Sequence, residues 1–157
     1  EGNLLNIFEQ YHDELNLFDY EGSSNNLIKI EFLGGSCEEE LQYVITNTSY
    51  PEKEYLVSFS RENENSIGGI FVIGIDNDDN LYFLKRLFKK NKQGSLYSVH
   101  KFSFEDEKLE SHDIDDRKIL PTEGLTDHLI TVDYSGNVYQ LQTSEDKVEV
   151  KKYIIGK

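Results

Sequence analysis

From Leu27 onward, the sequence is a succession of short segments rich in β-branched and aromatic residues, separated by turn residues. Apolar and polar side chains alternate within several of them, as in residues 43–47, and this period of two is typical of half-buried strands. Gly, Asn, Asp and Ser dominate the intervening segments, which predicts short turns. We expect strands at Leu27–Leu33, Leu41–Asn47, Tyr55–Ser60, Ile70–Ile75, Leu81–Leu87, Leu96–Phe104, Lys108–His112, Leu129–Asp133, Val138–Thr143 and Lys147–Ile155.

The composition favours the same fold class. The chain has 157 residues, enough for one domain with a buried core, and it contains no Ala, the best helix former. We expect a single α+β domain over residues 1–157 that is mainly β. In this fold an N-terminal amphipathic helix precedes an antiparallel β-meander over residues 27–157, and the meander forms one large curved sheet.

Turn signals support the meander. Ser135-Gly136-Asn137 predicts a hairpin turn, since Gly and Asn tolerate positive φ. Pro51 and Pro121 fall between the predicted strands, where they interrupt no ladder. Ser36-Cys37-Glu38-Glu39 fits a capping box, so a short helix before Leu41 is an alternative there.

Residues 1–19 carry a helical pattern instead. Their apolar residues are spaced by four, three, four and three positions, which places them on one stripe of a helix; they are Leu4, Phe8, Tyr11, Leu15 and Phe18. We expect this helix to pack on the sheet, with a partner-docking helix or a stalk after a membrane anchor as alternatives. The sequence begins at Glu1 without Met, which slightly favours a removed leader or anchor, and hence an extracytoplasmic location, over a cytoplasmic one.

An internal repeat links two of the predicted hairpins. Residues 73–76 and 80–84 resemble residues 130–133 and 137–141, and the offset is the same at every aligned position. The length of this offset matches one four-stranded blade of a β-propeller. However, a third copy placed around Asp19 coincides with the helical stripe, and 157 residues are too few to close an ordinary propeller. We interpret the repeat as two hairpins with the same turn chemistry, and a propeller fragment is the alternative.

Residues suited to catalysis are sparse. The sequence contains no phosphate-binding glycine loop, no G-x-S-x-G turn and no H-E-x-x-H motif. Cys37, the only cysteine, follows a Gly-Gly-Ser turn and has His100 or His128 as a conceivable base, but adjacent glutamates disfavour a thiolate. His12 and His112 are not spaced as metal ligands. We therefore expect no enzymatic activity, no catalytic residue, no metal and no cofactor.

The segment Asp76-Asn77-Asp78-Asp79-Asn80 places oxygen-bearing side chains at alternate positions, as the start of a calcium loop does. The resemblance ends there, because Leu81 stands where the loop needs Gly and Leu87 where it needs a bidentate Glu. A tight polar hairpin is the better interpretation.

Charge is the most informative feature for function. The chain has 30 acidic and 16 basic residues, a formal charge of −14, which argues against general nucleic-acid binding. Its longest apolar run, Ile67–Ile75, is too short to span a membrane as a helix. An acidic face would steer a basic protein partner, although acidic loops also maintain solubility. The candidate partner-binding residues are Glu105, Asp106, Glu107, Glu110, Asp113, Asp115 and Asp116.

In its small size, its strong acidity and its lack of a catalytic set of residues, the chain resembles the bacterial immunity proteins that neutralise toxins. Residues 128–153, with Ser135-Gly136-Asn137-Val138-Tyr139 and Asp146-Lys147-Val148, are also similar to the paired hairpins of the SMI1/KNR4-like family, which includes immunity proteins. The chain departs from that family because no helix follows the last predicted strand. The resemblance implies a monomeric antitoxin that covers the active site of a basic toxin domain. A peptide- or protein-binding scaffold module is the alternative.

Overall fold

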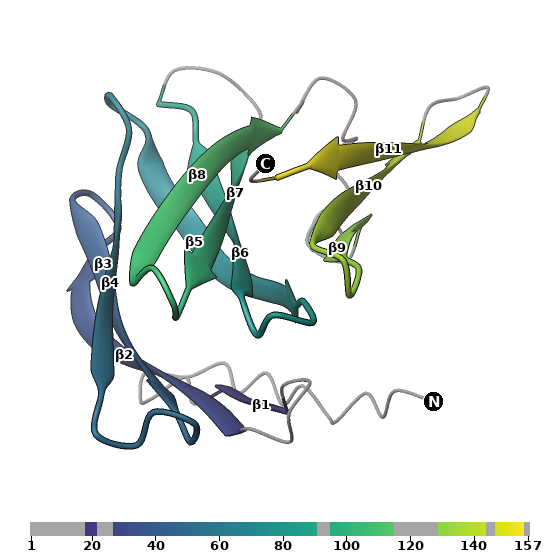
Figure 1. Ribbon diagram of the computed structural model, residues 1–157. Helices are drawn as coiled ribbons and strands as arrows, with labels where there is room; N and C mark the ends of the chain where they lie inside the picture. The colour runs from purple at the N-terminus through teal and green to yellow at the C-terminus, as the bar shows by residue number, and fades with distance from the viewer. Residues whose placement is uncertain (1–17, 22–26, 91–94, 115–128, 144–146, 156–157) are drawn as a thin grey trace.

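The computed structural model describes residues 18–21, 27–90, 95–114, 129–143 and 147–155 (Figure 1). This part of the chain is mainly β and contains no α-helix. Its strands are β1 (Phe18–Glu21), β2 (Leu27–Ser36), β3 (Glu40–Asn47), β4 (Glu54–Ser60), β5 (Ser66–Ile75), β6 (Leu81–Phe88), β7 (Ser95–Ser103), β8 (Lys108–Ile114), β9 (Ile130–Val132), β10 (Asn137–Thr143) and β11 (Val148–Ile154).

The strands form three antiparallel sheets, in the orders β1-β2-β3-β4, β5-β6-β7-β8 and β11-β10-β9. Within each sheet, every strand pairs with the next strand along the chain. The prediction of antiparallel meanders is therefore confirmed. The prediction of one large curved sheet is wrong, because β4 does not pair with β5 and β8 does not pair with β9 in the described structure (Figure 1).

All ten predicted strands are present, with small differences at their ends. The largest difference is at β5, which begins at Ser66 instead of Ile70. A bulge between Ile67 and Gly69 accommodates the two adjacent glycines, Gly68 and Gly69, within β5. Residues 37–39 form a turn rather than a helix, closed by the bond from Glu39 N–H to Ser36 O at 2.9 Å. Pro51 lies in the turn between β3 and β4, as predicted.

The predicted N-terminal helix is wrong at its C-terminal end. Phe18 and Asp19 belong to β1, where they pair with Ile30 and Lys29 of β2. Backbone pairing with a neighbouring strand decides the conformation here, and a strand of four residues is too short to show an alternation of its own. Residues 1–17 of the predicted helix, and Pro121, lie outside the described residues.

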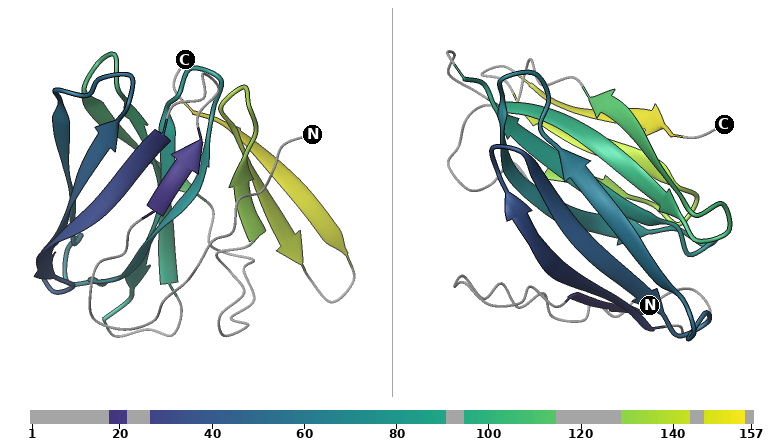
Figure 2. Two further views of the ribbon diagram at one scale, coloured as in Figure 1. Left: turned by 90° about the horizontal axis from the view of Figure 1, so that it is seen from below. Right: turned by 90° about the vertical axis from the view of Figure 1, so that its left-hand side faces the viewer.

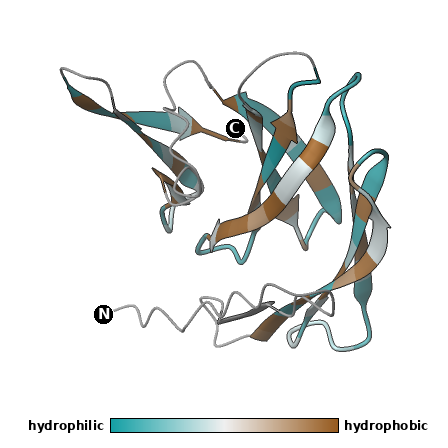
Figure 3. Ribbon diagram, turned by 180° about the vertical axis from the view of Figure 1, so that it is seen from behind, coloured by the Kyte–Doolittle hydropathy of each residue, from teal (hydrophilic) through white to brown (hydrophobic). Residues whose placement is uncertain are grey.

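The three sheets are stacked face to face, with β5–β8 in the middle (Figure 2). One apolar core lies between the first and middle sheets, where Ile45 and Phe59 pack with Phe83. A second core lies between the middle and third sheets and contains Leu84 and Val138. Apolar and polar residues form alternating bands along several strands, as the hydropathy colouring shows (Figure 3).

Strand β6 is the centre of the stack. Its residues from Leu81 to Lys85 are all buried, because odd-numbered side chains face the first sheet and even-numbered ones face the third. A sheet with one solvent face would bury only every second residue. Coverage on both faces therefore explains the continuous apolar run at residues 81–84.

The first hairpin of each of the three sheets has the same strand register. Glu21 pairs with Leu27, Ile75 with Leu81, and Val132 with Val138, and in each case five residues connect the paired positions. The repeat consequently has three copies. In the first copy, Leu27 is the equivalent of Leu81, so Gly22, and not Asp19, stands at the position of Asp76.

Candidate functional site

The turn between β5 and β6 is organised around the carboxylate of Asp76. Its Oδ1 accepts hydrogen bonds from the backbone N–H groups of Asp78 and Asn80, both at 3.0 Å. The Asn80 side-chain amide donates to both carboxylate oxygens, and the Tyr82 hydroxyl donates to Oδ2 at 2.9 Å. Burial, together with the bond to Asp76, raises the pKa of Tyr82 far above its ordinary value. The carboxylate ties the turn to the start of β6.

The turn between β9 and β10 contains the same set of bonds. Asp133 Oδ1 accepts from the N–H groups of Ser135 and Asn137 at 2.9 Å, and Tyr139 donates to Oδ2 at 2.9 Å. The Asn137 side-chain amide donates to both oxygens, at 3.1 and 2.9 Å. The bonds from the side chain and backbone of Asn137 lower the pKa of Asp133 to about 2.

The two turns also contact each other. The N–H of Asn77 donates to the carbonyl of Tyr134 at 2.9 Å. Gly136, with a φ of 76°, lies so close to the first turn that a Cβ on it would be 3.1 Å from the Asp76 carboxylate. The second turn therefore covers the first, and the two Asp turns connect the middle sheet to the third.

Neither Asp turn offers a cation site. N–H and O–H donors surround both carboxylates, whereas calcium requires several oxygen ligands whose lone pairs are available. The residues that the structure describes contain no group of three or more His, Cys, Asp and Glu side chains able to hold a metal ion. The prediction of a tight polar hairpin at residues 76–80 is confirmed.

Four hairpin turns lie at one end of the stack. The β5–β6 and β7–β8 turns share this end because successive turns of a meander alternate between its two ends. The Asn77–Tyr134 bond brings the β9–β10 turn to the same end, and an ion pair of 2.6 Å between Lys53 and Glu107 brings the β3–β4 turn there. We call this the acidic end; its carboxylates that reach solvent include Asp78, Asp79, Glu105, Asp106 and Glu107.

The predicted acidic residues are only partly brought together. Glu105, Asp106 and Glu107 occupy the exposed β7–β8 turn at the acidic end. Glu110 lies within β8, where a bond of 2.7 Å from Lys108 lowers the pKa of its carboxyl. This ion pair partly neutralises the strand portion of the predicted surface.

Asp113 lies away from the acidic end. Asp113 is six positions further along the chain than Glu107, which corresponds to about 20 Å of extended strand. Asp115 and Asp116 lie outside the described residues. The acidic end therefore gains Asp78 and Asp79 from another turn, which the linear segment did not include.

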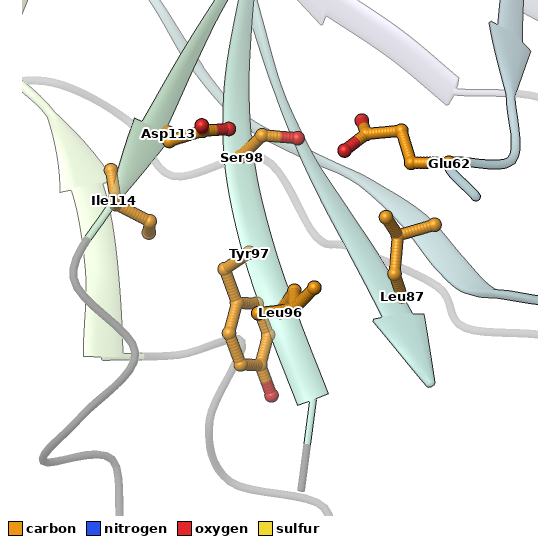
Figure 4. Close-up of a pocket in the computed structure, with 7 residues that line it drawn as sticks. All are labelled: Glu62, Leu87, Leu96, Tyr97, Ser98, Asp113 and Ile114. Carbon is orange, nitrogen blue, oxygen red and sulfur yellow. The ribbon is translucent and has the colours of Figure 1, made fainter. Parts of the chain in front are cut away.

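Asp113 lines a small pocket of about 160 Å³ toward the opposite end of the middle sheet (Figure 4). The polar groups of Asp113, Ser98 and Glu62 point to its interior. The pocket is lined by Glu62, Leu87, Leu96, Tyr97, Ser98, Asp113 and Ile114. Beside it, the buried Lys85 donates to the carbonyl of Ser60 at 3.2 Å and forms an ion pair with Glu62.

A serine and a histidine are hydrogen-bonded next to this pocket. Ser98 Oγ lies 3.0 Å from His100 Nε2, and both side chains are buried. Burial, then the charge of Lys85, then that of His112 lower the pKa of His100 to about 4. Such a weakly basic imidazole does not suit the activation of a hydroxyl near neutral pH. The imidazole packs edge-on against Phe59, 5.2 Å away between ring centroids.

The remaining candidate residues are dispersed. Cys37 is exposed in the β2–β3 turn, where its carbonyl accepts a bond from Ile67 at 2.7 Å. His112 is partly buried on β8, and His12 and His128 lie outside the described residues. Sequence reasoning missed Lys85, although its position on the apolar face of β6 between Phe83 and Leu87 was a signal for a buried lysine.

Comparisons with known proteins give no relative of this chain. No family model, no curated protein sequence and no solved structure matches it. Within the described ranges, no helix is long and apolar enough to cross a membrane.

Proposed function

We propose that this chain is a non-enzymatic, protein-binding module of stacked, β-propeller-like sheets, which presents its acidic end to a basic protein partner. The observation that carries the proposal is the pair of equivalent Asp turns, which repeat the same hydrogen bonds and pack on each other. Repetition of one sheet unit with fixed turns is typical of scaffold proteins that bind partners through aligned loops.

The acidic end suits such a role. Its turns rest on sheets whose two apolar cores fix them in place, so little conformational entropy is lost when a partner binds. Glu105 and Asp106 are exposed in one turn, and Asp78 is exposed in another. Carboxylates arranged in this way orient a basic partner and accelerate its encounter more than they add affinity.

Toxin neutralisation is a second candidate that uses the same surface. The carboxylates of the β7–β8 turn project from a hairpin at the edge of the middle sheet, as they must if this turn inserts into a basic active site. The stacked repeats favour the general scaffold module, because occlusion of an active site does not need repeated sheets. Inhibition of a toxin by the module, in a complex of one to one stoichiometry, would favour the immunity proposal instead.

The test is a titration of the ¹⁵N-labelled chain with a Lys- and Arg-rich peptide, followed by amide chemical shifts. We expect the shifts to concentrate at residues 78–79 and 105–107. The double variant Glu105→Gln/Asp106→Asn should weaken binding severalfold. The matched control, Glu38→Gln/Glu39→Gln, removes the same charge from exposed positions in the β2–β3 turn and should have a much smaller effect. Equal effects of the two variants, or shifts spread over the whole surface, would overturn the proposal.

A further inference from the structure

The outward face of the third sheet repeats a face that the other two sheets bury. The cross-strand pair Leu141–Val150 occupies the same register position as Leu84–Val99 in the middle sheet and Ile30–Ile45 in the first. The middle and first pairs are buried against the next sheet of the stack. In the third sheet, Val150 is 64% exposed. Val150 therefore stands at a position that contacts another sheet in the rest of the stack, but in the third sheet it is exposed to solvent.

The other end of the stack carries the complementary open face. Leu27 of β2 stands at the register position of Leu81 of β6, which packs against the first sheet, and Leu33 lies further along β2, at the bulge of the β2–β3 ladder. In the first sheet these residues face outward, where Leu33 is 56% exposed; Leu56 of β4, on the far side of β3, is 61% exposed. Each terminal sheet thus exposes apolar side chains on the face that the other would contact in a continued stack, and on the first sheet the Lys29–Glu31 ion pair stands between Leu27 and Leu33.

We propose that copies of this chain associate head to tail through these two faces. The outward face of the third sheet, formed by Val148, Val150 and Ile154, packs on the outward face of the first sheet of the next copy, formed by Leu27, Leu33 and Leu56. The contact continues the internal stacking of sheets, whose apolar cores show the required geometry. Because the two faces differ, the assembly is heterologous and forms a ring or an open chain.

This inference departs from the monomer expected from the sequence resemblance. It rests on the stacking of the sheets and not on binding at the acidic end. Variants of Glu105 and Asp106 should therefore leave self-association unchanged, so the failure of one proposal is distinguishable from that of the other.

Two single variants test the proposal by sedimentation velocity over a wide range of concentration. Val150→Lys blocks the face of the third sheet, and Leu56→Lys blocks the face of the first. The wild-type mass should rise with concentration, while each variant alone stays monomeric. A mixture of the two variants should form a dimer of one to one stoichiometry, because Leu56→Lys retains an open third sheet and Val150→Lys retains an open first sheet.

The controls separate loss of contact from loss of fold. Ser49→Lys, at an exposed position in the β3–β4 turn, should associate as the wild type does. Leu33→Lys replaces Leu56→Lys if circular dichroism shows that the latter is unfolded. A wild-type chain that stays monomeric at every concentration, or folded variants that form no mixed dimer, would overturn the proposal.

Discussion

A Cβ atom placed on Gly136 would lie 2.5 Å from the hydroxyl oxygen of Tyr82, although Gly136 lies in the β9–β10 turn of the third sheet and Tyr82 in β6 of the middle sheet. Tyr82 is fully buried, and its hydroxyl donates to Asp76 in the first turn. The contact therefore couples the Asp turn of the middle sheet to that of the third. It makes the absence of a side chain at position 136 a requirement of the stack.

Gly136→Ala should consequently destabilise the protein. The new methyl group meets the buried Tyr82 hydroxyl, and the φ of 76° is unfavourable for alanine, so we expect a loss of about 1–3 kcal/mol in the free energy of unfolding. Urea denaturation measures it. Gly34→Ala is the control, because that glycine also has a positive φ but no atom within 4 Å of the added Cβ, and its loss should be smaller. Equal losses would contradict the contact.

Asp133 should titrate well below an ordinary aspartate. Its pKa in the folded state is about 2, against a usual 3.8, so it stabilises the fold above pH 3.8 and this stabilisation is lost as the pH falls toward 2. Tyr139→Phe removes one donor and should raise the pKa of Asp133. A ¹³C titration of the carboxyl group measures both values. A wild-type midpoint near 3.8 would contradict the hydrogen-bonded turn.

His100 should make stability depend on pH in the mildly acidic range. Its folded pKa is about 4, below the usual 6.5, so the unfolded chain takes up this proton first as the pH falls. The stability contributed by neutral His100 is complete above pH 6.5 and decreases by about 3 kcal/mol between pH 6.5 and 4. In His100→Gln this part of the pH dependence should disappear. Parallel stability profiles for the variant and the wild type would count against the buried imidazole.

Substitutions of Lys85 and of Glu62 should change the stability of the fold by unequal amounts. The Lys85 side chain is 4% exposed and the Glu62 side chain 47% exposed, so only the lysine carries a full desolvation cost. Glu62→Gln leaves a buried ammonium without its carboxylate and should destabilise by about 1–3 kcal/mol. Lys85→Met should be nearly neutral, and it should raise the pKa of His100 because the Lys85 charge lowers it. Thermal unfolding and an imidazole NMR titration measure the two effects.

The sequence predicted the strands well because their alternation and turn residues are local properties. It could not predict that the first ladder ends at β4, since the β4–β5 connection, residues 61–65, is as short as the hairpin turns within the sheets. One sequence signal does indicate the stacked arrangement. The continuous apolar run at residues 81–84 requires cover on both faces of its sheet, which a single curved sheet cannot provide.

The first copy of the repeat is difficult to recognise in the sequence for a different reason. The offset between the other two copies, applied once more toward the N-terminus, places Asp19 at the position of Asp76, and Asp19 is a strand residue. Strand pairing instead makes Leu27 the equivalent of Leu81, a slightly shorter spacing. At that register, Gly22 and Ile28 stand where the other copies have the Asp and Tyr that bond to each other.

The acidic end was likewise only partly predictable. Glu105 and Asp106 are neighbours in the sequence, so the charge pattern already groups them. Asp78 and Asp79 join them through the meander, which returns the chain to the same end of the middle sheet, and not through the sequence.

The most direct test of the stacked repeat is an NMR measurement of contacts between the sheets. Nuclear Overhauser effects should connect the Hα protons of Gly136 with the Tyr82 ring, and the Phe59 ring with the Phe83 ring, whose centroids are 5.3 Å apart. These pairs join three sheets that share no backbone ladder. If both contacts are observed, the sheets stack as described. If strand pairing is present within each sheet but neither contact is detected, the stacked module, and with it the function proposed here, is contradicted.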